Sequence, residues 1–314
     1  MDSDARTLVI SVPDDKLEKD LAGLPGIEVV RWDMGDSAPR AAFDIVVPPY
    51  IRSPRVLARL EGVDVRLVQS QSIGYEAAAR HLPPGIVYAN AATVHEDSTA
   101  ELALTLTLAA QRQIPRLVAA QSEGRWAGAR EGDAFPPSLA DRRVLIIGFG
   151  GVGTAIAARL RGFEAQVEAV ATRARVEDGI VVHALDELSG LLPQTEIVIL
   201  ALPGGEETAK LVDNAFLAAL PDDALLVNVG RGSLVDTEAL LRHLHAGRIR
   251  AALDVVDPEP VPEGHPLWSA PGLLLTPHVG GASTAMRPRI AKLVRTQAER
   301  MQRGEEPINV VLRT

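Results

Sequence analysis

The sequence predicts an α/β protein made of two doubly wound, parallel-sheet domains. Three observations support this fold class. Short apolar runs alternate with helical stretches from end to end. One apolar run leads directly into a glycine-rich turn that opens a helix. The length of 314 residues fits two domains of ordinary size.

The composition is that of a globular chain and narrows the possible chemistry. Hydrophobic residues make up 46% and charged residues 23% of the chain, and cysteine is absent. A disulfide scaffold, thiolate catalysis, iron–sulfur clusters and Cys-ligated zinc are therefore excluded. A net charge of −9 argues against nucleic-acid binding. No segment approaches the about 18 apolar residues of a membrane span. The polar N-terminus does not resemble a signal peptide, so we expect a cytoplasmic protein.

The first part of the chain contains five candidate strands separated by amphipathic or loop segments, at residues 7–11, 27–32, 44–47, 65–69 and 85–88. A long helical stretch, about 96–122, then interrupts the alternation. Its acidic start suits a helix N-terminus. Residues 100–110 are apolar nearly all round, which predicts burial against another domain or another subunit.

A second alternating series contains seven candidate strands, at residues 143–147, 167–171, 180–183, 196–201, 224–229, 251–256 and 273–276. Most are continuous Val/Ile/Leu runs, which are typical of parallel strands covered on both faces. A final helix at about 284–303 precedes a short apolar tail, 308–312. Two α/β units joined around residue 95 are therefore expected.

The glycine-rich turn is Gly148-Phe149-Gly150-Gly151-Val152-Gly153. Gly148 permits the tight turn, Gly150 lets the backbone approach a pyrophosphate, and Gly153 lets helix and strand pack closely. The helix N-terminus then offers free N–H groups to the anion. This context predicts dinucleotide binding. A structural turn without a ligand, or a methyltransferase using the turn for another nucleoside cofactor, remains the alternative.

The residues after the next strand bear on which dinucleotide is bound. NAD sites carry an acid there for the ribose 2′-hydroxyl, but the position falls near Ala171 and is not acidic. Thr172, Arg173 and Arg175 follow, and guanidinium groups suit a 2′-phosphate. Glu168 lies mid-strand, too early to reach the ribose. The sequence therefore favours NADP, with NAD possible, unless the arginines are only solvated loop charges.

Three charged or titratable residues follow three consecutive late strands. These are Arg231, Glu259 and His278. Ligands of open α/β sheets bind outside the carboxyl ends of the strands, so the three side chains could converge there. Each residue alone is weak evidence, because a single His, Arg or Glu in a loop is more often structural.

Around these residues the chain resembles the D-isomer-specific 2-hydroxyacid dehydrogenase family. The resemblance covers nearly the whole length and rests on four motifs: residues 148–153, Val227-Asn228-Val229-Gly230-Arg231-Gly232, Asp254-Val255-Val256-Asp257-Pro258-Glu259-Pro260 and Thr276-Pro277-His278-Val279-Gly280-Gly281. By this resemblance His278 is the acid/base, Glu259 is its partner and Arg231 anchors the substrate. It also implies Rossmann-like or flavodoxin-like domains with a substrate cleft between them: residues 1–95 plus 289–314 as the substrate domain and 96–288 as the dinucleotide-binding domain.

The resemblance further implies an NAD(P)-dependent oxidoreductase acting on a small 2-oxo acid or D-2-hydroxy acid of the glyoxylate or hydroxypyruvate type. A phosphoglycerate-type dehydrogenase and a non-enzymatic, nucleotide-sensing corepressor are the alternatives. The implied cofactor contacts beyond the turn are Leu202, Pro203, Val229, Gly230, Asp254 and Gly280. Backbone N–H groups of Ser72, Ile73 and Gly74 would hold the substrate carboxylate, although Tyr75-Glu76 departs from the family pattern. No histidine spacing suggests a metal site, and the region of Trp126 implies a homodimer.

Overall fold

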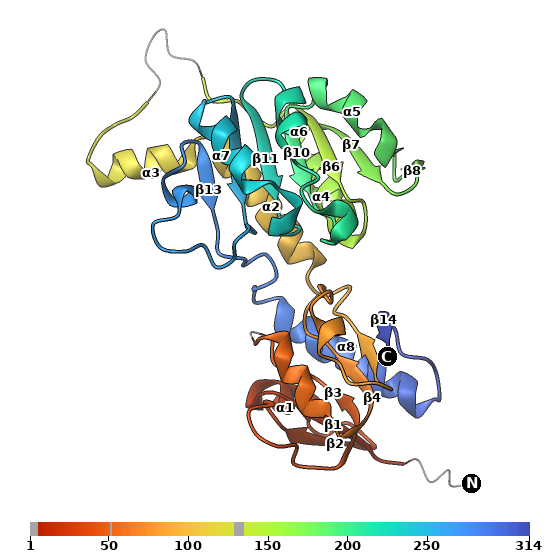
Figure 1. Cartoon of the computed structure of the whole chain (residues 1–314). Coiled ribbons are helices and arrows are strands. Elements are labelled where there is room, and N and C mark those ends of the chain that lie inside the picture. The colour runs from red at the N-terminus through yellow and green to blue at the C-terminus, as the bar shows by residue number, and fades with distance from the viewer. Residues whose placement is uncertain (1–5, 51, 129–134) are drawn as a thin grey trace. The chain divides into compact units, whose positions relative to one another are not determined.

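The computed structural model describes residues 6–50, 52–128 and 135–314. The chain divides into two compact units, Met1–His95 with Ala282–Thr314, and Glu96–Gly281 (Figure 1). The sequence-based division placed the second boundary at residue 288. In the structure the segment that leads into the last helix belongs with the first unit, as does the helix itself.

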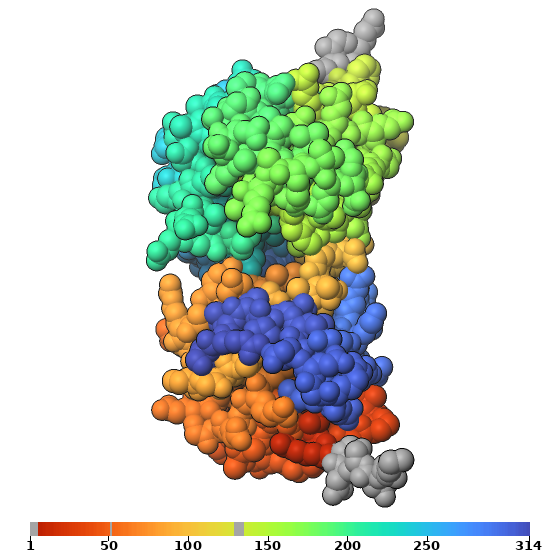
Figure 2. All heavy atoms as spheres, turned by 90° about the vertical axis from the view of Figure 1, so that its right-hand side faces the viewer, coloured from red at the N-terminus to blue at the C-terminus, as the bar shows by residue number. Residues whose placement is uncertain are grey.

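The first unit contains a six-stranded sheet in the order β14-β5-β4-β3-β1-β2. Five strands are parallel: β1 (Leu8–Val12), β2 (Ile27–Arg31), β3 (Ala42–Val46), β4 (Asp64–Gln69) and β5 (Val87–Ala89). The apolar tail forms a sixth strand, β14 (Val310–Arg313), antiparallel to β5. Figure 2 shows the dark blue C-terminal residues packed beside the orange residues of this unit.

Helices cover both faces of this sheet. Leu8, Ile10 and Val12 of β1 pack with α1 (Asp15–Leu21) and α8 (Met286–Gln302) in one buried cluster. A second cluster lies under η1 (Pro54–Leu60) and η2 (Ala78–Arg80). The last helix of the chain thus completes the core of the first unit.

The second unit contains an eight-stranded sheet in the order β13-β12-β11-β10-β6-β7-β9-β8. Seven strands are parallel: β6 (Arg143–Ile147), β7 (Gln166–Ala171), β9 (Ile180–Ala184), β10 (Ile197–Leu200), β11 (Ala224–Asn228), β12 (Ile249–Leu253) and β13 (Leu273–Leu275). A short strand, β8 (Arg175–Glu177), pairs antiparallel with β9 and was not predicted. With two parallel-dominated sheets, the predicted α/β class is confirmed.

Both faces of the second sheet are buried, which explains its continuous apolar runs. Val144 and Ile146 pack with α2 (Glu96–Gln111) and α4 (Gly151–Leu160) on one face. Leu145 and Ile147 pack with α5 (Leu188–Leu191), α6 (Asn214–Ala219) and α7 (Thr237–His245) on the other. The remaining helical turns are η3 (Arg161–Phe163), η4 (Leu185–Glu187), η5 (Leu192–Gln194), η6 (Glu206–Thr208), η7 (Gly232–Leu234) and η8 (Pro266–Ser269).

The structure corrects one expectation about the long helical stretch and refines another. It is not one helix, because α2 ends at Gln111 and α3 (Ile114–Ser122) begins after Gln113, whose φ is +55°. Pro115 lacks an N–H and its ring would clash with the carbonyl four residues earlier, which breaks the helix. The buried side chains of the apolar part pack on α4 and the sheet of their own unit, which the sequence-based expectation had not named. Within the described residues, no helix is both long and apolar enough to span a membrane.

Candidate active site

The glycine-rich turn follows β6 at the point where the sheet order reverses. Gly148 has φ +97°, and its N–H donates to the Val170 carbonyl at 2.8 Å. A Cβ on Gly153 would lie 2.0 Å from the Gly148 carbonyl oxygen, so no side chain fits there. A Cβ on Gly150, in contrast, would meet no atom within 4 Å. The turn is therefore tight on its inner side and open where a pyrophosphate would approach the N–H groups of α4.

The predicted cofactor contacts after β10 and β11 lie against this turn. A Cβ on Gly148 would lie 2.6 Å from the Leu202 nitrogen, and one on Gly230 would lie 2.7 Å from the Leu202 carbonyl oxygen. Three loops thus meet backbone to backbone at the carboxyl ends of β6, β10 and β11. Pro203 and Val229, the other two predicted contacts, are the chain neighbours of these residues.

The residues after β7, where the sequence predicts the ribose of the cofactor, include two arginines with different surroundings. Arg173 is exposed in the turn after the strand. Arg175 instead begins β8, where its Nη2 donates to the Phe149 carbonyl at 3.0 Å and its Nε to Glu177 at 2.6 Å. Its guanidinium also lies 5.7 Å from the centre of the Phe149 ring. The two arginines therefore have different surroundings, because Arg175 is tied to the glycine-rich turn.

Glu168, in the middle of β7, contacts the neighbouring strand β9. Its carboxylate lies 3.0 Å from His183 Nε2 on that strand.

Arg231 lies in a turn held by a residue that the sequence analysis did not select. Asn228, fully buried at the end of β11, donates from Nδ2 to the Arg231 carbonyl at 2.9 Å. Its Oδ1 accepts from the Gly230 N–H at 3.0 Å. A Cβ on Gly232 would lie 1.8 Å from the Val256 carbonyl oxygen, so this turn rests on the backbone that follows β12. A polar residue ending a buried apolar strand was the signal that could have identified Asn228.

His278 and Glu259 form the predicted pair. The Nδ1 of His278 is hydrogen-bonded to Oε1 of Glu259, and both side chains remain partly exposed, 51% and 38% respectively. The hydrogen bond to Glu259 raises the pKa of His278, and the charges of Glu259 and Asp254 act in the same direction. Burial and the charge of Arg231 oppose this rise in the pKa. The three predicted residues therefore share one electrostatic environment.

Asp254 holds the loop that carries His278. Its carboxylate is 3% exposed and accepts hydrogen bonds from Thr276 Oγ1 at 2.6 Å, from the Val279 N–H at 2.9 Å and from the Gly280 N–H at 2.8 Å. Its carbonyl accepts from the His278 N–H at 2.8 Å. His278 has φ +54°, a conformation that costs free energy for a non-glycine residue. These four hydrogen bonds hold that conformation.

The predicted substrate loop lies in the first unit, after β4. Asn90 Nδ2 donates to the Ile73 carbonyl at 2.9 Å, and the Ser72 N–H donates to Ser70 Oγ at 3.0 Å. Among the described residues, no acceptor is bound by the N–H groups of Ile73 or Gly74. The protein binds carbonyl groups of this loop, so the N–H groups of Ile73 and Gly74 could donate to an anion. The N–H of Ser72, in contrast, already donates to Ser70 Oγ.

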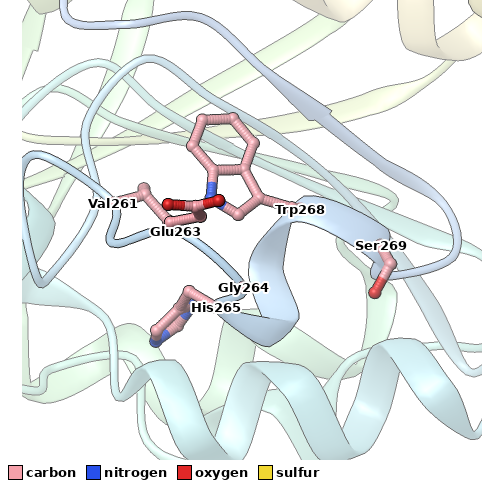
Figure 3. Close-up of a pocket in the computed structure, with 6 residues that line it drawn as sticks. All are labelled: Val261, Glu263, Gly264, His265, Trp268 and Ser269. Atoms are coloured by element: carbon pink, nitrogen blue, oxygen red, sulfur yellow. The ribbon is translucent and has the colours of Figure 1, made fainter.

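An open depression of about 670 Å³ lies in the segment that follows Glu259 (Figure 3). It is lined by Val261, Glu263, Gly264, His265, Trp268 and Ser269. None of the predicted site residues lines it. Trp268 donates from Nε1 to the Pro262 carbonyl at 2.8 Å, which fixes the indole over the loop.

The chain resembles known proteins in sequence and in fold. Residues 104–280 match the family model described as D-isomer specific 2-hydroxyacid dehydrogenase, NAD binding domain. The chain is 33% identical to the glyoxylate reductase of Pyrococcus furiosus over 263 residues, which cover 79% of this chain and 76% of that protein.

Solved structures are similar over nearly the whole chain. An NADPH-dependent glyoxylate/hydroxypyruvate reductase from Sinorhizobium meliloti, in complex with NADP and malonate, is 29% identical with a TM-score of 0.77 and covers 98% of both chains. A D-isomer specific 2-hydroxyacid dehydrogenase from Xanthobacter autotrophicus, in complex with NADPH and MES, is 27% identical with a TM-score of 0.79 and also covers 98% of both chains.

Proposed function

Because the chain belongs to the D-isomer-specific 2-hydroxyacid dehydrogenase family, we propose that it uses NADPH to reduce a small 2-oxo acid to the D-2-hydroxy acid. The family makes it an NAD(P)-dependent oxidoreductase. Glyoxylate and hydroxypyruvate are the proposed substrates, which the names of similar reductases support. The observation that carries the proposal is the His278–Glu259 hydrogen bond in an environment that also contains Arg231.

Each site residue has a separate role in the proposed reduction. A nicotinamide dinucleotide whose pyrophosphate is held at the glycine-rich turn would supply the hydride that adds to the carbonyl carbon. The protonated His278 gives its proton to the carbonyl oxygen, which completes the alcohol. Glu259 keeps the imidazole protonated and oriented through the hydrogen bond at Nδ1. Arg231 holds the substrate carboxylate through two parallel N–H donors and so orients the carbonyl.

The preference for NADPH over NADH rests on the residues after β7. No acid follows this strand, whereas Thr172 offers a hydroxyl and Arg173 an exposed guanidinium. A 2′-phosphate needs such donors and is repelled by a carboxylate. The NADP and NADPH complexes of similar structures support the same preference.

The first unit is proposed as the substrate domain and the second as the dinucleotide-binding domain. In the first, the unused amides of Ile73 and Gly74 would bind the substrate carboxylate. We also propose a homodimer paired through α3, where Ile114, Leu117 and Val118 are exposed, and through Trp126, which is 96% exposed. Large apolar side chains gathered on one exposed segment are typical of a protein interface.

The test is turnover by the full-length protein. Oxidation of NADPH and of NADH is followed by absorbance against a panel of 2-oxo acids that includes glyoxylate, hydroxypyruvate and pyruvate. We expect glyoxylate or hydroxypyruvate to have the highest kcat/KM, with NADPH the better donor. Oxidation of 3-phosphoglycerate as the fastest reaction would favour the phosphoglycerate-type dehydrogenase. NADPH binding without turnover of any acid would favour the nucleotide-sensing corepressor.

A further inference from the structure

The two amides proposed to bind the substrate belong to peptide groups whose carbonyls are held by the residues that follow β5. The Ser72 carbonyl accepts from the Ala91 N–H at 2.9 Å, and the Ile73 carbonyl accepts from Asn90 Nδ2 at 2.9 Å. Both peptide bonds are trans, so each N–H points opposite to its C=O. The N–H groups of Ile73 and Gly74 are therefore directed away from residues 90 and 91.

Asn90 has a partner at each of its polar atoms and is 7% exposed. Its N–H donates to the Asn309 carbonyl at 2.9 Å, its carbonyl accepts from Gln69 Nε2 at 2.9 Å, and its Oδ1 accepts from the Ala92 N–H at 3.2 Å. A flipped carboxamide would set Oδ1 against the Ile73 carbonyl oxygen and Nδ2 against an N–H. The carboxamide of Asn90 is therefore fixed with its donor toward the loop.

Two more buried carboxamides continue this network to the last helix. The Nε2 of Gln69 also donates to the Ser70 carbonyl at 2.9 Å, and its Oε1 accepts from Gln297 Nε2 of α8 at 2.8 Å. Gln297 in turn exchanges hydrogen bonds with both backbone groups of Ile308, at 2.8 and 3.0 Å. Gln69 is 0% and Gln297 1% exposed. A buried polar network with every member satisfied is rigid, so the segment before β14 supports Asn90 from behind.

We propose that Asn90 is a positioning residue for the substrate: its carboxamide fixes the peptide group between Ile73 and Gly74 so that the Gly74 N–H meets the substrate carboxylate. This inference rests on the proposed function, in which these amides bind the carboxylate. Both polar atoms of the Asn90 side chain are used within the protein, so Asn90 acts through the loop. Its effect is expected in the binding of anionic ligands rather than in the proton transfer by His278.

The test is Asn90→Ser, because a serine hydroxyl can still accept from the N–H two residues on but lacks the carboxamide donor to Ile73. We expect the KM for glyoxylate and the Ki of oxalate, an unreactive dicarboxylate, to rise together by roughly 10- to 100-fold, since a displacement of about 1 Å can cost on the order of 100-fold. The kcat should change less. The Kd for NADPH and the pH profile should match the wild type, because neither the glycine-rich turn nor His278 contacts this network.

The matched control is Asn309→Gly. It removes a hydrogen bond of the same length in the same unit, from Nδ2 to the Ala92 carbonyl at 2.9 Å, and glycine suits its φ of +58°. This variant should keep the wild-type KM and Ki even if its Tm falls. An equal rise of both constants in Asn309→Gly would show a general loosening of the first unit and contradict the proposal.

The remaining outcomes separate this inference from the proposed function. A folded Asn90→Ser with wild-type KM and Ki would overturn the role of Asn90 while the wild type still reduces glyoxylate. A wild type that reduces no 2-oxo acid would overturn the proposed function itself. If Asn90→Ser does not fold, Gln69→Met removes the donor to the Asn90 carbonyl and should raise the same two constants. Wild-type constants in Gln69→Met would then overturn the inference.

Discussion

At the scale of single residues, the function depends on how Glu259 tunes His278. Glu259→Gln removes the charge and replaces the charge-assisted hydrogen bond, which together raise the pKa of His278, by at most a neutral hydrogen bond. The pKa of the imidazole falls, although the Asp254 charge still raises it, and burial and Arg231 still lower it. Reduction needs the protonated imidazole, so the alkaline limb of the kcat/KM profile should move to lower pH. A pH profile identical to that of the wild type would remove Glu259 from the pair.

The two arginines after β7 should have different effects on cofactor use. Arg173→Ala should weaken NADPH by roughly 10- to 100-fold and leave NADH nearly unchanged, because a charge-assisted hydrogen bond contributes about 1.5–3 kcal/mol. Arg175→Ala should weaken both cofactors alike, because Arg175 binds the Phe149 carbonyl of the turn. Fluorescence titration of each variant with both reduced cofactors measures this. Equal losses for NADPH and NADH in Arg173→Ala would contradict the assignment.

The backbone geometry of the glycine-rich turn could be predicted at this scale, because close backbone approaches and a positive φ favour glycine. Gly148 and Gly153 show the tight geometry expected of them. The clamp made by Asp254 could not be predicted, because it depends on how residues 276–280 fold back over a neighbouring strand end. Asn228 could have been noticed as the polar end of a buried apolar strand, but its partners, the backbone atoms of its own turn, could not have been predicted.

At the scale of elements, the loop that carries His278 is predicted to depend on Asp254. Asp254→Asn places an amide where both carboxylate oxygens accept hydrogen bonds, leaving at least one buried donor unpaired at a cost of about 1–3 kcal/mol. We expect a lower Tm, a lower kcat and an alkaline limb at lower pH. Thr276→Val removes one of these bonds and should have a smaller effect. A large loss of NADPH affinity with an unchanged pH profile would instead identify Asp254 as a direct cofactor contact.

Sequence periodicity predicted the parallel strands well and the connections less well. Buried strands such as β6 and β11 are continuous apolar runs that few other structures can bury. The break between α2 and α3 was missed because apolar residues stand on either side of the polar run Gln111–Gln113, although Pro115 marks the place. The short strand β8 was missed because its residues are mostly exposed and its pairing with β9 is antiparallel. Both errors concern local geometry that apolar patterning does not report.

At the scale of the whole molecule, the exposed apolar residues of α3 predict an assembly of two chains. Val118 is 53% exposed in a helix whose only buried residue is Ala120. Val118→Asp should dissociate the dimer, because a carboxylate buried at an apolar interface loses its hydration. Sedimentation velocity should give a dimer for the wild type and a monomer for the variant. A wild-type protein that sediments as a monomer would contradict the proposed pairing.

The most direct test of the proposed function is the rate of NADPH oxidation with glyoxylate or hydroxypyruvate, compared between the wild type and His278→Ala. The positioned proton donor predicts a kcat lower by roughly 10²–10⁴-fold in the variant. The Kd for NADPH should be nearly unchanged, because the glycine-rich turn follows β6 and does not include His278. Wild-type turnover by His278→Ala, or NADPH binding by the wild type without turnover of any 2-oxo acid, would contradict the account.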